Sequence, residues 1–308
     1  MATEAITQPE IRLRAARRRW GEDVIKGVLA LFALLSIATT VGIVVSLLFP
    51  AIEFFREVSV WDYLTGTDWS PLFAPAHFGV LPLVAGTLLV TVVAAALCTS
   101  CGLGSAIYMS EYARPRVRKW LKPLLELLAG IPTVVYGYFA LVFVTPRLQE
   151  LGLVSGAFNA LSAGIVMGVM LIPTVASVSE DAMAAVPSSL RYGAYALGSS
   201  KLQVATRIVV PAAISGIVAS FVLAISRAVG ETMIVLIAAG GQPNLTFDPR
   251  EAVETMTAFI AATGNGDVPT GSIEYKTIFA VGLTLFVMTF AMNIVSIRLV
   301  RKYREVYE

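Results

Sequence analysis

Cysteine, histidine and charged residues are scarce in this sequence of 308 residues. Two cysteines cannot form a disulfide framework, and a single histidine leaves too few soft ligands for a zinc site. The sequence also lacks the H-E-x-x-H motif and any histidine within an apolar run, which excludes an intramembrane metalloprotease or serine protease. Charged residues make up 14% of the chain, against roughly 25% in a soluble domain, so a water-soluble surface is excluded.

Long apolar runs take the place of the missing charge. Five charge-free runs reach the length of about 20 residues that a helix needs to cross a bilayer, and a sixth is interrupted only by Arg227 and Glu231. Backbone groups in lipid must be satisfied within their own segment, so these runs are expected to be helices. We therefore predict an all-α transmembrane fold of six helices. The predicted spans are about 27–49, 80–108, 123–145, 158–179, 212–239 and 276–298.

The distribution of lysine and arginine predicts how these spans are oriented. Placing the N-terminus in the cytoplasm puts nearly every basic residue that flanks a span on the inside, as the positive-inside rule requires. The exceptions, which fall outside, are Arg56, Arg147, Arg250 and Lys276. Both termini are then cytoplasmic, as a basic segment at 1–26 and a tail at 301–308, with a cytoplasmic loop at 181–211 and outside loops at 50–78 and 240–275. The net charge of +2 is too small to indicate nucleic acid as a partner.

The two outside loops contain features with more than one interpretation. Trp61, Tyr63 and Trp69 in the first loop fit an interfacial aromatic belt, and they also fit a docking surface for an external protein. The apolar spacing from Arg250 to Thr263 in the second loop predicts a short amphipathic helix.

The cytoplasmic loop predicts a helical elbow that projects from the membrane. Pro187 suits a first helical turn, so a helix is expected from Pro187 to Leu197, and Gly198 should end it. A second helical stretch, Lys201 to Val210, leads to the next span. An elbow with no partner is the alternative interpretation.

The elbow resembles the cytoplasmic loop in permeases of binding-protein-dependent ABC importers. The resemblance rests on Tyr192-Gly193-Ala194, Gly198 and the ending Ile208-Val209-Val210-Pro211; the family usually has Glu-Ala-Ala where this chain has Tyr-Gly-Ala. It implies a type I importer permease whose short helix enters a cleft of an ATPase subunit and transmits nucleotide-driven closure. The family's Glu is absent, which puts in doubt the salt bridge it would make. The residues that the resemblance assigns to coupling are Pro187, Leu190, Tyr192, Gly193, Ala194, Leu197 and Gly198.

Three further motifs resemble the phosphate-specific permeases, in particular the PstC type. They are Phe78-Gly79-Val80-Leu81-Pro82 with Gly86-Thr87, Ala129-Gly130-Ile131-Pro132-Thr133-Val134-Val135-Tyr136-Gly137, and Arg227-Ala228-Val229-Gly230-Glu231-Thr232. The resemblance implies phosphate as substrate, a PstA-type second permease, two copies of a PstB-type ATPase, an external PstS-type binding protein, and a place in the bacterial cytoplasmic membrane. A permease for sulfate or molybdate and a non-transporting scaffold are the alternatives.

Arg227 and Glu231 are the charged residues within an apolar run. At a spacing of four they would share one helix face. An arginine at mid-span costs about 2.5–3.5 kcal/mol on insertion scales, so it must face the bundle interior or water. The pair is either a structural clip or part of an anion path, because the planar guanidinium matches the oxygens of phosphate. In the second interpretation Glu231 holds the guanidinium in position, and Thr232, the next residue in the sequence, also belongs to the path.

Pro132 interrupts the third predicted span, where a kink would leave Thr133 and Tyr136 as polar lining of the path. Close helix packing explains the flanking Gly130 and Gly137 equally well. The glycine pair Gly193 and Gly198 is not followed by the lysine of a phosphate-binding loop. The chain is therefore expected to be no enzyme and to hold no cofactor, with ATP and magnesium bound by the partner ATPase.

Overall fold

The computed structural model describes residues 20–302. Most of the basic segment predicted at 1–26, and residues 303–308 of the predicted tail, therefore lie outside the described residues. The chain divides into two compact units, one ending at Ser46 and one beginning at Leu47. In the first unit the described residues form one continuous helix, the N-terminal part of α1 (Trp20–Glu57), and most apolar side chains of this part are exposed.

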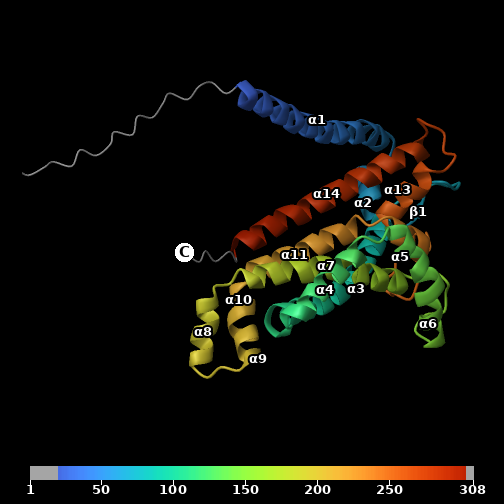
Figure 1. Ribbon diagram of the computed structural model, residues 1–308. Coiled ribbons are helices and arrows are strands. Elements are labelled where there is room, and N and C mark those ends of the chain that lie inside the picture. The colour runs from blue at the N-terminus through green and yellow to red at the C-terminus, as the bar shows by residue number, and fades with distance from the viewer. Residues whose placement is uncertain (1–19, 303–308) are drawn as a thin grey trace, which may run out of the picture. The chain divides into compact units, whose positions relative to one another are not determined.

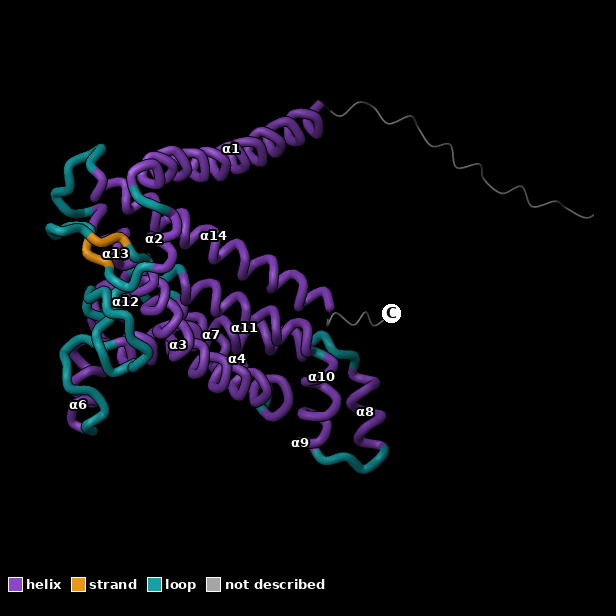
Figure 2. The backbone as a smooth tube through the Cα atoms, turned by 180° about the vertical axis from the view of Figure 1, so that it is seen from behind, coloured by secondary structure: helices purple, strands orange, loops and turns teal. Residues whose placement is uncertain are grey.

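Within the second unit, α3 (Leu81–Ile107) and α7 (Ala160–Ala184) run side by side (Figures 1 and 2). Glycines permit their close approach, since a Cβ at Gly164 would lie 2.6 Å from the Val93 Cβ and one at Gly168 would lie 2.9 Å from the Leu97 Cβ. Small residues have this role at membrane helix contacts, where van der Waals packing replaces the hydrophobic effect. The bundle is completed by α11 (Ile214–Val229), which contacts α3 and α7, and by α14 (Ile273–Lys302), which contacts α11.

Four helices of the described chain are long and apolar enough to cross a membrane without a break. They are α1, α3 with its π-helical extension η1 (Tyr108–Tyr112), α7 and α14. Two bent pairs complete up to six spans if each pair is counted as one. In the first, α4 (Pro115–Ala129) and the segment Thr133–Glu150 meet at 88°, and in the second, Lys201–Ala212 and α11 meet at 73°.

The two predicted spans that contain breaks are shorter as helices than the sequence indicated. The predicted span 123–145 is divided into α4, α5 (Thr133–Phe139), η2 (Ala140–Val144) and α6 (Thr145–Glu150). The predicted span 212–239 is divided into α11, which ends at Val229, and α12 (Met233–Ala238). Both divisions lie at the motifs that contain the candidate site residues.

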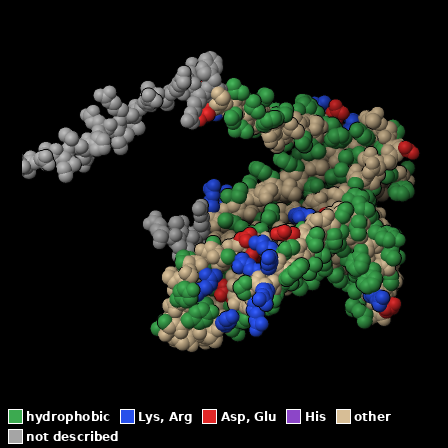
Figure 3. Space-filling view, in the orientation of Figure 1, with side chains coloured by type: hydrophobic (Ala, Val, Ile, Leu, Met, Phe, Trp, Pro, Cys, Tyr) green, Lys and Arg blue, Asp and Glu red, His purple; other side chains and the backbone are tan. Residues whose placement is uncertain are grey.

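The predicted elbow has the helix–Gly–helix form. Helix α8 (Ser188–Ala196) follows Pro187, and Gly198 adopts a φ of +80°, a left-handed conformation that suits glycine because it has no Cβ. Ser200 and Gln203 then form a capping box at the start of α9 (Lys201–Val204), which continues through η3 (Ala205–Val209) and α10 (Val210–Ala212). Figure 3 shows that many Lys and Arg side chains on this face lie toward the end of the bundle that carries α8–α10.

At the opposite end, the segments predicted as outside loops (50–78 and 240–275) build a small aromatic core. It contains α2 (Val60–Thr65), the two-stranded hairpin of β1 (Trp69–Ser70) and β2 (His77–Phe78), and α13 (Met256–Gly264). Tyr63 and Trp69 are 1% and 4% exposed, so the expectation that they form an interfacial belt is wrong for both, and Trp61 alone of the three is exposed. The predicted helix Arg250–Thr263 is also shorter, because Thr255 caps α13 at its N-terminus.

Candidate translocation site and coupling elbow

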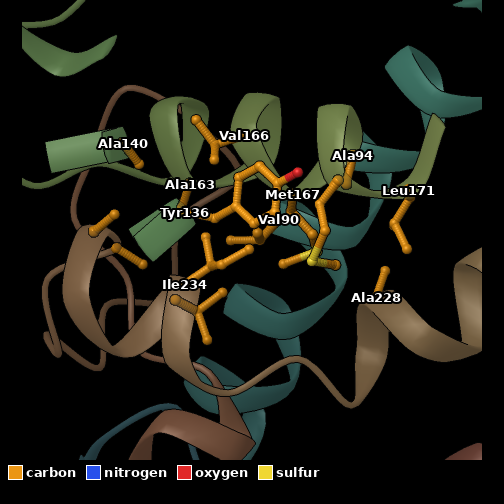
Figure 4. Close-up of a cluster of buried hydrophobic side chains, with 14 of the residues drawn as sticks. Val90, Ala94, Tyr136, Ala140, Ala163, Val166, Met167, Leu171, Ala228 and Ile234 are labelled. Carbon is orange, nitrogen blue, oxygen red and sulfur yellow. The ribbon is translucent and has the colours of Figure 1, made fainter. Parts of the chain in front are cut away.

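The first candidate region is the break between α4 and α5 at Pro132. Proline has no N–H, so the Leu128 carbonyl four residues earlier loses its normal helical donor. The Tyr136 hydroxyl donates to this carbonyl at 2.7 Å and replaces the missing bond. Figure 4 shows the Tyr136 ring among Ala163, Val166 and other buried side chains of the main core. Tyr136 is 6% exposed and its hydroxyl closes the kink, and its place on the lining of a path stays a prediction.

The second candidate region is the break between α11 and α12 at Gly230 and Glu231. The prediction that Arg227 and Glu231 share a helix face is wrong, because α11 ends at Val229 between them. Among the described residues, no ion pair or hydrogen bond joins the two side chains. The Glu231 Oε1 accepts instead from the backbone N–H groups of Met233 at 3.1 Å and Ile234 at 3.4 Å, and so caps α12.

Glu231 is held in place from two sides. Its carboxylate is 9% exposed, and its backbone carbonyl accepts a hydrogen bond of 2.6 Å from the Thr257 hydroxyl on α13. A carboxylate buried in this way needs hydrogen-bond donors, and the free N–H groups at a helix N-terminus supply them together with a favourable dipole. The structure therefore uses Glu231 to stabilise the break rather than to neutralise Arg227.

Arg227 lies in the last turn of α11 and its side chain is exposed in the single chain. Its charge is close enough to interact electrostatically with the Tyr136 hydroxyl of the other break. The two breaks are also in direct contact through Gly137, where an added Cβ would lie 3.0 Å from the Met233 carbonyl oxygen and 3.2 Å from the Ile234 Cα. The structure thus brings together the motifs around Pro132 and Arg227, which are almost 100 residues apart in sequence.

The remaining predicted path residues lie on the surfaces of these breaks. Pro132 is exposed, and Thr133 begins α5 and is half-buried. Thr232 is also half-buried, and its hydroxyl donates to the Gly230 carbonyl at 3.4 Å. Two hydroxyl side chains and one guanidinium therefore remain at accessible positions around the contact between the breaks.

The coupling residues predicted on the elbow are mostly exposed. Leu190, Tyr192, Gly193, Leu197 and Gly198 are exposed, with Tyr192 at 71% and Leu197 at 89%. Pro187 is half-buried at the start of α8. Ala194 is 8% exposed and packs in the apolar cluster inside the elbow, with Val204, Val209 and Ala213.

The sequence analysis missed the ion pairs of two charged side chains, one on the elbow and one on α7. Arg191 of α8 donates to Glu111 Oε1 at 3.0 Å and to the backbone carbonyls of Met183 and Val186 at 2.7 and 2.6 Å. Glu180, which is 1% exposed near the end of α7, is paired with Arg118 and with Lys122 of α4. The partners are 58 to 80 positions apart, and no local spacing indicates such pairs.

Comparisons with known proteins agree with this architecture. Residues 100–305 match the family described as binding-protein-dependent transport system inner membrane component. The probable ABC transporter permease protein YqgH of Bacillus subtilis is 36% identical over 96% of each chain. The phosphate transport system permease protein PstC of Haemophilus influenzae is 29% identical over 93% of this chain and 95% of its own. PstC 1 of Mycobacterium tuberculosis is 31% identical over 78% and 81%, respectively.

Solved structures give the same fold at lower sequence identity. A bacterial alginate ABC transporter, crystallised with its alginate-bound periplasmic protein, matches with a TM-score of 0.63 at 16% identity, over 93% of this chain and 98% of that one. The inward-facing methionine transporter MetNI matches with a TM-score of 0.57 at 17% identity, over 73% and 96%.

The candidate spans define a multi-pass membrane protein, and its fold is the one seen in these ABC transporter structures. The chain belongs to the binding-protein-dependent transport system inner membrane component family, as a permease subunit.

Proposed function

We propose that this permease imports inorganic phosphate and forms half of the translocation path, beside a second permease of the PstA type. The names of the PstC relatives support this substrate, although YqgH is named only as a permease. The observation that carries the proposal is Arg227, an exposed guanidinium without a hydrogen bond or ion pair among the described residues, in the last turn of α11 before the break that precedes α12.

The chemistry of Arg227 favours an oxyanion as its ligand. A guanidinium stays charged when it is desolvated, and its fork donates in parallel to two oxygens of a phosphate. Exposure to lipid would be costly for this side chain, so its exposed face must meet the second permease or the path between the two. Because Glu231 is committed to α12, it leaves the arginine fork free, and its role in this proposal is positioning. The hydroxyls of Thr133 and Thr232 offer further donors nearby.

The elbow provides the connection to ATP hydrolysis in this proposal. The exposed surface of α8 around Leu190, Tyr192 and Leu197 would enter the cleft of a PstB-type ATPase, of which two copies bind ATP and magnesium. The pairs Arg191–Glu111 and Glu180–Lys122 would carry its movement to α3 and α4. An external PstS-type protein would deliver phosphate at the other side of the bacterial cytoplasmic membrane.

Substitution of Arg227 by lysine tests the path directly. Arg227→Lys keeps the positive charge but removes the fork, so phosphate uptake by the assembled transporter is expected to fall at least about tenfold, which corresponds to one lost charge-assisted hydrogen bond. Arg298→Lys makes the same change on an exposed arginine of α14 and is the matched control, with uptake expected to stay at the wild-type rate. Equal uptake by the two variants at equal assembly would contradict the proposal.

The competing interpretations differ in their response to solutes. A sulfate or molybdate permease would show ATPase stimulation and uptake with those anions and none with phosphate. A non-transporting scaffold would show no ATPase stimulation by any loaded binding protein in the reconstituted complex.

A further inference from the structure

A cavity of about 370 Å³ lies among the outside loops, between the β-hairpin and α13. Trp69, Phe73 and Phe259 form its aromatic walls, and Glu254 and Asp267 contribute its charge. No basic residue lines it, and all its lining residues belong to the unit that begins at Leu47. The cavity is separate from the breaks at Pro132 and Gly230 described above.

Glu254 is a buried carboxyl group without a partner. It is 9% exposed, and within the described chain its carboxyl group makes no hydrogen bond or ion pair. Burial raises its pKa to about 7. The backbone around it is fixed by α3, since a Cβ at Gly86 would clash with the Glu254 carbonyl oxygen and the Thr87 hydroxyl accepts from the Met256 N–H at 3.0 Å. The Gly86-Thr87 motif thus holds this carboxyl group at the cavity.

Trp69 forms a rigid aromatic wall of the same cavity. The residue is 4% exposed, and its indole Nε1 is buried without a hydrogen-bond partner. Edge-to-face contacts with Phe259 at 5.0 Å and Tyr63 at 6.2 Å hold the ring rigidly. The indole ring is therefore a fixed aromatic wall of the cavity, and the Glu254 carboxyl group lines the same cavity with no hydrogen-bond or ion-pair partner in the described part of the chain.

The chemistry of the cavity selects a cation that has an apolar stem. A carboxylate at the inside and Asp267 nearer the surface attract positive charge, and aromatic faces bind an ammonium or guanidinium group further through cation–π attraction. Leu72 and Phe73 beside the opening are 53% and 75% exposed, an apolar rim of the kind that macromolecular contacts cover and small solutes leave in water.

We propose that this cavity receives a lysine or arginine side chain of the external binding protein when that protein docks on the permease. The proposal rests on the proposed function for the partner and on the sequence-predicted orientation for the side of the membrane. Docking pairs the guanidinium or ammonium group with Glu254, and the rim residues Leu72 and Phe73 are covered at the same time. The interaction sets the affinity of docking and has no part in the choice of transported solute.

The test uses the complete importer, with both permeases and the ATPase, in lipid nanodiscs, titrated with a labelled external binding protein of the PstS type. Glu254→Gln is expected to weaken docking about tenfold or more, since a buried charge pair is lost. Glu251→Gln, the same change at an exposed position three residues earlier, is the matched control and is expected to leave the affinity within about twofold. A Glu254→Lys variant should regain affinity for a binding protein in which the docked basic residue is changed to glutamate.

A measurement of pH dependence and one of melting temperature separate docking from folding. Wild-type docking should tighten between pH 6 and pH 8 as Glu254 loses its proton, while Glu254→Gln should show a smaller change; Asp267 is the other acidic group on the cavity. The melting temperature of Glu254→Gln should equal or exceed that of wild type, because a buried charge is removed.

Equal docking by Glu254→Gln and Glu251→Gln overturns the inference, and so does a wild-type complex that binds no external protein. If Glu254→Gln lowers the melting temperature as well as the docking affinity, Glu254 is assigned to packing, and this result also overturns the inference. Saturation of the cavity by free lysine without any effect on docking would make a small solute the occupant. None of these outcomes depends on whether the transported anion is phosphate, which the Arg227→Lys uptake measurement tests separately.

Discussion

The two helix breaks at the centre of the bundle solve opposite problems. At Pro132 a carbonyl oxygen loses its donor, and a neutral hydroxyl from Tyr136 replaces it. At Gly230 the N–H groups of a new helix lack acceptors, and the carboxylate of Glu231 supplies one. The breaks touch through Gly137, whose Cα lies against the backbone of Met233 and Ile234.

The difference shows which break is suited to an anion path. The Tyr136 hydroxyl carries no charge, so the Pro132 break can be packed in an apolar core, as the burial of Tyr136 shows. The Glu231 carboxylate brings a charge into the bundle. Arg227 lies one turn before it, and its guanidinium has no hydrogen bond or ion pair among the described residues. We infer that the first break is mainly a geometric device and the second places the charged groups that act on the substrate.

The contact between the breaks is where a substitution should have its largest effect. Gly137→Val places branched carbons where a Cβ alone would lie 3.0 Å from the Met233 carbonyl oxygen and from Ile237 Cδ1. The backbone of α12 cannot move without breaking the Glu231 cap, so we expect a loss of stability of up to about 3 kcal/mol. The melting temperature of the assembled complex measures this loss, and phosphate uptake should fall with it.

A glycine in open space provides the control for this substitution. Gly104 lies in α3 with nothing within 4 Å of an added Cβ, so Gly104→Ala should leave stability unchanged or raise it by up to about 1 kcal/mol through helix propensity. If Gly137→Val melted at the temperature of the Gly104 variant, the two breaks could not be in the close contact described.

The role of Glu231 can be separated from that of Arg227 by a double-mutant cycle. Glu231→Ala leaves the N–H groups of Met233 and Ile234 without an acceptor and is expected to cost about 1–2 kcal/mol, while Glu231→Gln keeps an acceptor oxygen and should cost less. Because the two side chains do not interact, the stability losses of Glu231→Ala and Arg227→Ala should add to within about 0.5 kcal/mol.

An interaction energy well above that value would show that Arg227 and Glu231 form the ion pair that the sequence predicted. The same cycle measured on phosphate uptake is expected to show coupling, because Glu231 positions the helix break beside which Arg227 acts on phosphate. Coupling in uptake without coupling in stability is therefore the specific signature of a positioning residue.

The two breaks also show what the sequence could and could not predict. The break at Pro132 could be predicted from the sequence, because the lack of an N–H is a property of the proline residue itself. Gly230 gives a much weaker signal within an apolar run of spanning length, so that run was predicted as one helix and Arg227 was placed beside Glu231. The partners of both breaks depend on backbone groups in the fold, the Leu128 carbonyl and the α12 N–H groups, which no spacing rule identifies.

The elbow was predicted more closely, because Pro187 and Gly198 determine the backbone within a few positions of themselves. Its anchors were not predicted: Arg191 and Glu111 are 80 residues apart and meet only when η1 and α8 are packed. Trp69 and Glu254 were missed as a pair for the same reason, since one lies in each outside loop. Local backbone chemistry was therefore accessible from the sequence, and contacts between distant elements were not.

The smallest of the expected effects tests the hydrogen bond that the Tyr136 hydroxyl makes at the Pro132 break. Tyr136→Phe keeps the ring among Ala163 and Val166 but removes the donor to the Leu128 carbonyl, so about 0.5–1.5 kcal/mol of stability should be lost. Tyr138→Phe, on the exposed side of the same helix, should cost nothing measurable. Uptake by Tyr136→Phe should stay near the wild-type rate if this break acts only through geometry. A fall in uptake as large as that of Arg227→Lys, without a matching fall in melting temperature, would instead give the hydroxyl a direct part in the path.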